Sequence, residues 1–281
     1  MIEFYSKVAE LLKSGRRIAI ASIISSRGST PRKTGAKMII TMEGESFFSI
    51  GGGSFEAVVV RDAQQLMREG NAIVKRYSFR EGEGGLGMTC GGEAEVLIEA
   101  LNPPDKLIIF GAGHVGSSLV QAAQNMGFEI FVVDHRKEVK ESFEKSRFVK
   151  RSSLMGALQP DYRSSAIHFV LTDGSFSTGL PEIDGSSYVV IATMSHESDR
   201  RALLTAIRKD PAYIGMIGSQ RKREELFKKA AAEDGIDAKL LKRVRCPVGL
   251  DIGSETPEEI AVSILAEIIS VKRKAAKRLK D

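Results

Sequence analysis

The chain has 281 residues, of which 42% are hydrophobic and 27% charged, a composition typical of a globular protein large enough for two domains. The net charge is only +5 and aromatic residues make up 6%, so neither composition nor charge favours a nucleic-acid-binding protein. No run of 18 apolar residues exists, which argues against a membrane-spanning helix.

Two further features favour a cytoplasmic location. The N-terminal segment from Met1 to Gly15 is amphipathic and carries acidic residues, unlike a signal peptide. The two cysteines, Cys90 and Cys246, suit a reducing compartment better than a disulfide scaffold.

The N-terminal part of the sequence predicts a small α+β domain. Apolar residues at helical spacing predict helices over Phe4–Ser14 and Phe55–Leu66. Apolar runs and alternations predict strands at residues 17–25, 36–41, 46–50, 72–79 and 93–100. Pro103 and Pro104 cannot continue a helix or a strand, so we place the boundary there and predict domains over residues 1–102 and 103–281.

Two glycine-rich loops of this domain are candidate binding elements. Gly51, Gly52 and Gly53 connect a predicted strand to a predicted helix, and they form either a second anion cradle or a plain tight turn. Cys90 lies in a loop that contains six glycines. It is either a soft ligand for a metal-bound group or for sulfur, or a small buried hydrophobic side chain.

The stretch from Lys106 to Arg136 predicts the central unit of a nucleotide-binding fold. An apolar run over Leu107–Phe110 predicts a buried strand, and the G-x-G-x-x-G sequence of Gly111–Gly116 follows it. A helix is then predicted whose apolar face extends to Met126. A second buried strand ends at Asp134.

Each glycine of this motif has an expected role. Gly111 allows the tight turn, Gly113 lets an anion approach the backbone, and Gly116 lets the helix lie close to the strand. Free N–H groups at the start of the helix would bind a phosphate, and Asp134 would accept hydrogen bonds from vicinal hydroxyls. The alternative is that the glycines make only a close turn and that Asp134 is a solvated strand end.

Strands and helices alternate in the remainder of the chain, which predicts an α/β fold with a Rossmann-like, doubly wound parallel sheet. Strands are predicted near Phe148–Val149 and at residues 166–171, 188–192 and 213–217, with a helix at 199–208. The strand at 166–171 is predicted to be buried. The last helix is predicted to start at Pro257 with a capping box made by Thr256 and Glu259.

Polar residues follow several of these strands, at the edge where ligands bind in such sheets. His114 would donate to an anion, or else cap or pack the helix. His196 beside Glu197 would orient a polar ligand, or belong to an acidic cluster at a helix start. Ser219, followed by three cations, would contact an anion, or precede a solvated basic face. No histidine or cysteine pair has the spacing of a metal site.

Several of these segments together resemble the XdhC/CoxI family. The N-terminal half of the family is resembled by Gly28–Arg32, by the Ile50–Gly53 turn followed by Glu56 and Ala57, and by Gly87–Gly92. The C-terminal Rossmann half is resembled by Gly111–Gly116, Tyr213–Ser219 and Pro247–Glu267. The sequence departs from the pattern in two places. Ser54 stands where some members have cysteine, and Ser195 stands where the family has the first acid of an Asp-His-Glu-x-Asp segment.

The resemblance implies an accessory protein for the maturation of xanthine dehydrogenase and related molybdenum hydroxylases. Such a chaperone would hold the molybdenum cofactor, a molybdopterin, protect it while its terminal sulfur is installed, and insert it into the apoenzyme. The implied partners are the apo hydroxylase and a cysteine desulfurase, and the expected state is a homodimer without turnover of its own. The composition adds the expectation of a cytoplasmic protein that binds neither nucleic acid nor a membrane. The predicted cofactor-binding residues are Gly52, Gly53, Cys90, Gly111, Gly113, His114, Gly116, Asp134, His196 and Ser219.

Two other functions fit parts of the sequence. The G-x-G-x-x-G motif with Asp134 is also typical of an NAD(P)-dependent oxidoreductase, although no acid/base pair for a hydride site is evident. A sulfur-transfer enzyme with Cys90 as its nucleophile is the third hypothesis, and no basic residue adjoins Cys90 in the sequence to support it.

Overall fold

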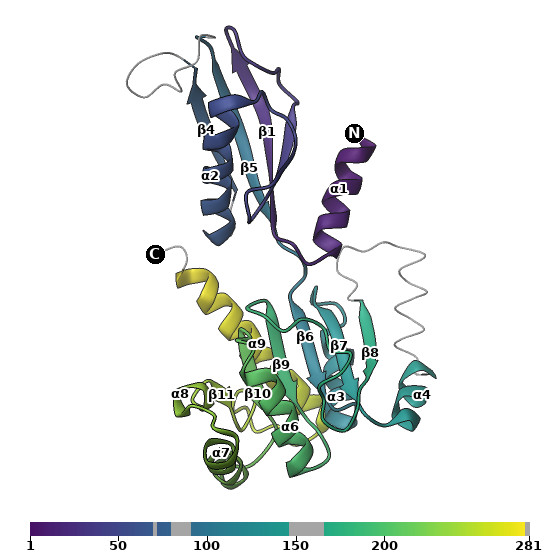
Figure 1. Cartoon of the computed structure of the whole chain (residues 1–281). Helices are drawn as coiled ribbons and strands as arrows, with labels where there is room; N and C mark the ends of the chain where they lie inside the picture. Colours follow the sequence, from purple (N-terminus) through teal and green to yellow (C-terminus); the bar gives the residue numbers. More distant parts are fainter. Residues whose placement is uncertain (70–71, 80–90, 146–165, 279–281) are drawn as a thin grey trace. The chain divides into compact units, whose positions relative to one another are not determined.

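The computed structural model describes residues 1–69, 72–79, 91–145 and 166–278, and the chain forms two compact units (Figure 1). The first unit is built on Met1–Pro103 and the second on Pro104–Ala275, so the division falls between the two consecutive prolines.

The first unit is an antiparallel sheet with a helix on each face. Its strands lie in the order β3-β2-β1-β5-β4. Alternate residues of the long central strand β1 point to opposite faces, as the pleat of a strand requires. Ala19, Ala21 and Ile23 pack with α2, whereas Ile18 and Ile20 pack with α1. The elements are α1 (Ile2–Lys13), β1 (Ile18–Arg27), β2 (Lys37–Thr41), β3 (Ser46–Phe48), α2 (Gly53–Glu69), β4 (Ala72–Ser78) and β5 (Glu93–Leu101).

The second unit confirms the predicted Rossmann-like sheet. Six strands lie in the order β11-β10-β9-β6-β7-β8, and every adjacent pair is parallel. The central strands are continuous apolar runs because helices cover both faces of the sheet. The strands are β6 (Lys106–Phe110), β7 (Glu129–Asp134), β8 (Ile167–Leu171), β9 (Ser187–Ile191), β10 (Tyr213–Met216) and β11 (Val244–Arg245).

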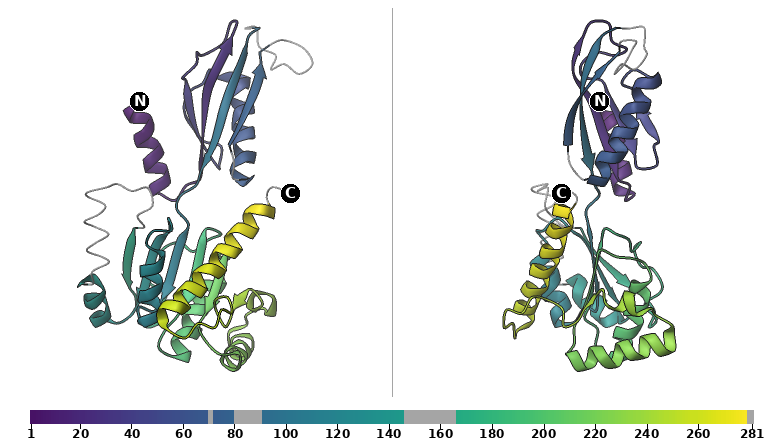
Figure 2. Two further views of the ribbon diagram at one scale, coloured as in Figure 1. Left: turned by 180° about the vertical axis from the view of Figure 1, so that it is seen from behind. Right: turned by 90° about the vertical axis from the view of Figure 1, so that its left-hand side faces the viewer.

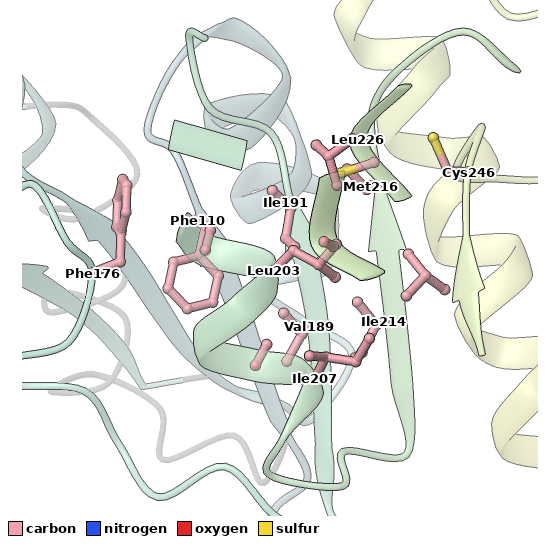
Figure 3. Packing of buried hydrophobic residues seen from close by; sticks show 14 of the residues in the cluster. Phe110, Phe176, Val189, Ile191, Leu203, Ile207, Ile214, Met216, Leu226 and Cys246 are labelled. Carbon is pink, nitrogen blue, oxygen red and sulfur yellow. The ribbon is translucent and has the colours of Figure 1, made fainter. Parts of the chain in front are cut away.

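The helices of this unit divide between the two faces (Figure 2). Figure 3 shows one face, where Phe110 and Val189 of the sheet pack with Leu203 of α6 and Leu226 of α7. On the other face, Leu107 and Ile109 pack with α3 and α9. None of the helices among the described residues is long and apolar enough to cross a membrane. The helices are α3 (His114–Ala123), α4 (Lys137–Lys145), α6 (His196–Ile207), α7 (Gln220–Asp234), α8 (Ala238–Leu241) and α9 (Pro257–Arg278).

Some details differ from the sequence predictions. The strand at 166–171 was predicted to be buried, and this prediction is wrong. It corresponds to β8, which is the edge strand of the sheet and has a neighbour on one side only. Helix α3 ends at Ala123, so Met126 lies beyond it and is 44% exposed. The strand predicted near residues 148–149 lies outside the described residues.

The predicted start of α9 is confirmed. Pro257 is its first residue. The amide of Glu259 donates to the Thr256 hydroxyl over 3.3 Å, and the Glu259 carboxylate accepts from the Thr256 amide over 3.0 Å. This reciprocal pair satisfies two backbone N–H groups that a helix start otherwise leaves free.

Candidate functional site

The strand order places the topological switch point of the sheet at the carboxyl ends of β6 and β9. These neighbouring strands lie where the connections diverge, since β6 leads outward to β7 and β9 leads outward to β10. In open α/β sheets, ligands bind at such a switch point. The backbone there is tightly packed, because the Ala192 amide donates to the Phe110 carbonyl over 2.8 Å.

The three motif glycines differ in the space around them. A Cβ at Gly111 would lie 2.2 Å from the Ala192 oxygen, and a Cβ at Gly116 would lie 2.0 Å from the Gly111 oxygen. Glycine is therefore required at both positions for packing alone. Gly113 has an ordinary φ of −73°, and nothing lies within 4 Å of the position of its missing Cβ. Packing within the protein does not explain this glycine, whereas close approach of a ligand to the backbone would.

The start of α3 is uncapped, unlike the starts of four other helices in this unit. Side chains accept hydrogen bonds from the first-turn amides of α6, α7, α8 and α9. Gly113 offers no side chain to cap α3, and among the described residues no group accepts a hydrogen bond from the amides of His114 or Val115. These amides, together with the helix dipole, are suited to bind an anion.

A pocket of about 520 Å³ opens beside this helix start. It lies between the first turns of α3 and the starts of α4 and α9. Its polar wall combines hydroxyls, one imidazole, one guanidinium and two carboxylates. The lining residues used below are Gly113, His114, Ser117, Ser118, Arg136 and Glu258. Ser118 donates to the Glu258 carboxylate over 3.1 Å, which links α3 to the start of α9.

Asp134 is not free to receive a diol, contrary to the role expected for it. The residue is 2% exposed. One carboxylate oxygen accepts from the Ala112 amide over 2.9 Å and from Nη2 of Arg136 over 2.7 Å. The other accepts from the Arg136 amide over 3.1 Å and from its Nε over 2.9 Å. Burial would raise the pKa of Asp134, but the hydrogen bonds from Arg136 and Ala112 outweigh it and lower the pKa below its usual value.

Comparison with known families identifies the chain. Residues 107–268 match the model described as the XdhC Rossmann domain, and residues 11–78 match that of the XdhC and CoxI family. The chain belongs to the XdhC and CoxI family.

Three curated relatives extend this comparison. The E. coli K12 protein named "Uncharacterized protein YqeB" is 33% identical over 98% of this chain and 47% of its own length. A Bacillus subtilis protein, named as a probable component of xanthine dehydrogenase, is 30% identical over 64% of this chain and 47% of its own length. The E. coli K12 protein named "Molybdenum cofactor insertion chaperone PaoD" is 25% identical over 94% of this chain and 86% of its own length. The chain thus spans about half the length of the first two relatives.

The segment around His196 and Glu197 lies at the start of α6, which follows β9. Ser195 caps this helix by accepting from the Ser198 amide, and His196 and Glu197 are exposed in its first turn. Glu197 pairs with Arg201 one turn later. This arrangement is that of an ordinary helix start, and a ligand role for His196 stays a prediction.

Ser219 caps α7 by accepting from the Lys222 amide over 3.2 Å. Its hydroxyl oxygen therefore already accepts a hydrogen bond from the first turn of α7. The Lys222 ammonium turns back to pair with Asp199, which is 1% exposed. Asp199 also accepts from the Thr193 hydroxyl over 2.6 Å, so it links the loop after β9 to the first turn of α7. None of these contacts tests whether Ser219 binds a ligand, so that role stays a prediction.

The amides of the triple-glycine turn in the first unit bind a carboxylate of the protein itself, that of Glu56. Oε1 of Glu56, in the first turn of α2, accepts from the amides of Ile50 and Gly51 over 2.9 and 3.1 Å. It also accepts from the Ser49 hydroxyl over 2.7 Å. Burial would raise the pKa of Glu56, but its hydrogen bonds, including one from the Gly52 amide, lower it. Gly52 and Gly53 therefore belong to a turn that Glu56 stabilises.

The family motifs of the first unit converge at one end of its sheet. Ser29 forms a bridge with Gly91, and a Cβ at Gly51 would lie 2.6 Å from Cβ of Pro31. Cys90 lies outside the described residues, so its predicted role is not addressed by these contacts. Among the residues with described positions, no group of three or more His, Cys, Asp or Glu side chains is arranged to hold a metal ion.

Sequence reasoning did not identify the partners of three charged residues, Arg136, Glu56 and Lys222. Arg136 follows Asp134 by two positions, but nothing in the sequence shows that its side chain folds back onto that carboxylate. Glu56 and Lys222 likewise use partners that only the folded turns bring within reach. An acid three residues after the last glycine of a turn was the one available signal, and it identifies Glu56 as a capping candidate.

Proposed function

We propose that this chain binds the molybdenum cofactor through its Rossmann unit and serves in the maturation of a molybdenum hydroxylase. Two observations support the proposal. The chain belongs to the XdhC and CoxI family, and a relative that it matches over 94% of its length is named a molybdenum cofactor insertion chaperone. The structural observation that carries it is the uncapped start of α3, where Gly113 and His114 line an open pocket.

The residues of this pocket fit a phosphate-bearing pterin. Its volume of about 520 Å³ lies within the range of roughly 300–1,000 Å³ that small-molecule sites occupy. Gly113 leaves the backbone open to a phosphate, which the amides of His114 and Val115 would hold. The guanidinium of Arg136, in the same pocket, is a further donor for the phosphate, and the hydroxyls of Ser117 and Ser118 are donors for the remaining polar groups. When bound, the cofactor supplies redox chemistry that is used in the client enzyme, and the chain's own residues only bind it and shield it from water.

The finer parts of the proposal follow the family resemblance. The client is an apo enzyme of the xanthine dehydrogenase type, and the chain is a cytoplasmic homodimeric chaperone without turnover. Cys90 would approach the sulfur-bearing end of the cofactor, with a cysteine desulfurase as the source of that sulfur. These statements rest on the sequence, because the contacts of Cys90 and of any partner lie outside the described structure.

The test is a pair of glycine-to-aspartate variants. Gly113→Asp would place a carboxylate where the phosphate binds, and we expect it to abolish retention of pterin during anaerobic purification. Gly185→Asp is the matched control, because Gly185 also has open space at its Cβ position and no positive φ, but does not line the pocket. Pterin is measured by its fluorescence after oxidation. Equal pterin in the two variants would rule out the α3 phosphate site.

The alternative function, an NAD(P)-dependent oxidoreductase, is favoured by the strand order and by the G-x-G-x-x-G turn. It is weakened by Asp134, whose oxygens are already used by Arg136 and Ala112. A wild-type protein that binds NAD(H) tightly and never carries pterin would establish this alternative instead.

A further inference from the structure

The Asp134–Arg136 pair changes what the β7 side of the α3 pocket can recognise. In dinucleotide-binding Rossmann folds, an acid at this strand end accepts hydrogen bonds from the ribose diol. Here both oxygens of Asp134 accept two hydrogen bonds each, all within 3.1 Å, and its side chain is 3% exposed. No well-placed acceptor remains for a diol.

Arg136 offers donors at the same place. A guanidinium carries five N–H donors in a rigid fork. Nε and Nη2 of Arg136 each donate one to Asp134, and Nη1 donates one to the Met194 sulfur. At least two donors are therefore left. The side chain remains 21% exposed and lines the pocket together with Gly113 and His114.

The position of the guanidinium is fixed before any ligand arrives. Its two parallel bonds to one carboxylate are the bidentate geometry that holds an arginine most rigidly. Asp134 is itself held by the Ala112 amide, which belongs to the glycine turn. A preorganised cation thus stands beside the free amides of α3, and both favour an oxyanion.

We infer that Arg136 sets the ligand class of this pocket: it makes the β7 side an oxyanion subsite, so that the pocket selects a ligand with a phosphate group there and discriminates against an uncharged vicinal diol. The inference deepens the proposed function and rests on its α3 site. It concerns the recognition of phosphate and holds for any phosphate ester of suitable size. Arg136 acts by direct contact with the ligand. It also occupies the oxygens of Asp134 that would otherwise accept hydrogen bonds from a diol.

The experiment uses two probes that differ by a single phosphate. The full-length protein, freed of bound ligand, is titrated with NADPH and NADH, which are identical except for the 2′-phosphate. We expect NADPH to bind about tenfold more tightly than NADH, the size of one charge-assisted hydrogen bond. In Arg136→Ala this preference should vanish or reverse, because the phosphate contact is lost and Asp134 becomes available to the diol. Arg136→Lys should give an intermediate ratio, since it keeps the charge but not the fork.

Lys137→Ala is the matched control. It removes the same charge one residue away, on an exposed side chain that does not line the pocket, and should leave the ratio unchanged. Thermal melting confirms that each variant is folded. Three results would overturn the inference: a wild type that prefers NADH, a ratio that Arg136→Ala does not alter, or no binding of NADPH at millimolar concentration.

Pterin content separates this inference from the proposed function. A wild type that carries pterin but shows none of the expected nucleotide preference would contradict the role of Arg136 while leaving the chaperone proposal in place. A wild type without pterin that prefers NADPH, and loses this preference in Arg136→Ala, would support the role of Arg136 and contradict the chaperone proposal.

Discussion

The oxygen of Gly111 lies 2.0 Å from the point where a residue other than glycine at position 116 would place its Cβ. The end of β6 and the first turn of α3 are thus in backbone contact, with no room for a methyl group. This contact brings the start of the helix to the edge of the sheet, where Gly113 and His114 line the pocket.

Gly116→Ala should destabilise the Rossmann unit strongly. The added methyl group meets a backbone carbonyl, which cannot turn away like a side chain, so we expect a loss of at least about 1–3 kcal/mol from overpacking. Thermal unfolding followed by circular dichroism measures it. Gly113→Ala is the control, because its methyl group enters open space, and it should melt close to the wild type. A Gly116→Ala protein as stable as Gly113→Ala would contradict the packing role of Gly116.

Glu56→Ala should destabilise the first unit. It leaves the amides of Ile50 and Gly51 and the hydroxyl of Ser49 without the carboxylate that accepts from them. The loss of a charged acceptor from partly buried donors costs about 1–3 kcal/mol. Urea unfolding measures the change, and Arg61→Ala, on an exposed position of the same helix, should be nearly neutral. If the two variants unfold alike, the turn does not depend on Glu56.

Asp134→Asn should show a pH-dependent loss of stability. Because the folded-state pKa of Asp134 is lowered, its carboxylate stabilises the fold at pH values above its unfolded pKa, about 3.9. That contribution disappears as the pH falls through the folded-state pKa. The unfolding free energies of wild type and variant should therefore differ most above about pH 5 and converge in acid. Asp251→Asn, at an exposed position, is the control, and a difference that does not vary with pH would refute the prediction.

Tyr213→Phe should cost about 1–2 kcal/mol, because it removes one hydrogen bond to a charged group in a buried setting. The Tyr213 hydroxyl donates to the Glu267 carboxylate over 2.6 Å, and the same oxygen accepts from the Gly249 amide over 2.9 Å. Burial, aided by Glu267, raises the pKa of Tyr213 well above its usual value, so the phenol stays protonated as a donor.

Tyr188→Phe is the comparison for Tyr213→Phe. Burial raises the pKa of Tyr188 to about 12, and no hydrogen bond among the described residues contributes to that shift. Removal of the Tyr188 hydroxyl should change the free energy of unfolding by less than Tyr213→Phe does. Equal losses in urea titrations would argue against the role of the Glu267 contact.

The buried pair of Asp199 and Lys222 should be strongly coupled. Lys222→Met leaves the Asp199 charge buried, with Thr193 as its one remaining partner among the described residues, which should cost about 3–5 kcal/mol. The double variant Asp199→Asn/Lys222→Met should lose less than the sum of the single variants. The exposed pair of Arg221 and Glu225 should show a coupling of only about 0.3–0.5 kcal/mol in the same double-mutant cycle. Additive losses at Asp199 and Lys222 would mean that the pair does not stabilise the link between the loop after β9 and α7.

Much of the fold can be predicted from local pattern. The apolar runs of β6, β7 and β9, the glycine turn after β6 and the capping box of α9 each depend on neighbours close in sequence. Periodicity and turn chemistry encode such features directly. The burial of β8 was predicted wrongly, because the apolar content of a strand does not reveal whether it lies at the centre or the edge of a sheet.

Local sequence pattern predicts only part of the candidate site. The sequence by itself determined that a glycine turn starts α3 at the carboxyl end of a buried strand, since backbone sterics require glycine at Gly111 and Gly116. Only the tertiary structure decided what the charged groups do there. Asp134 pairs with Arg136, Asp199 pairs with Lys222, and Glu56 accepts hydrogen bonds from its own turn. A buried or half-buried carboxylate pairs with whichever donor the fold brings within about 3 Å, and sequence spacing does not determine which donor that is.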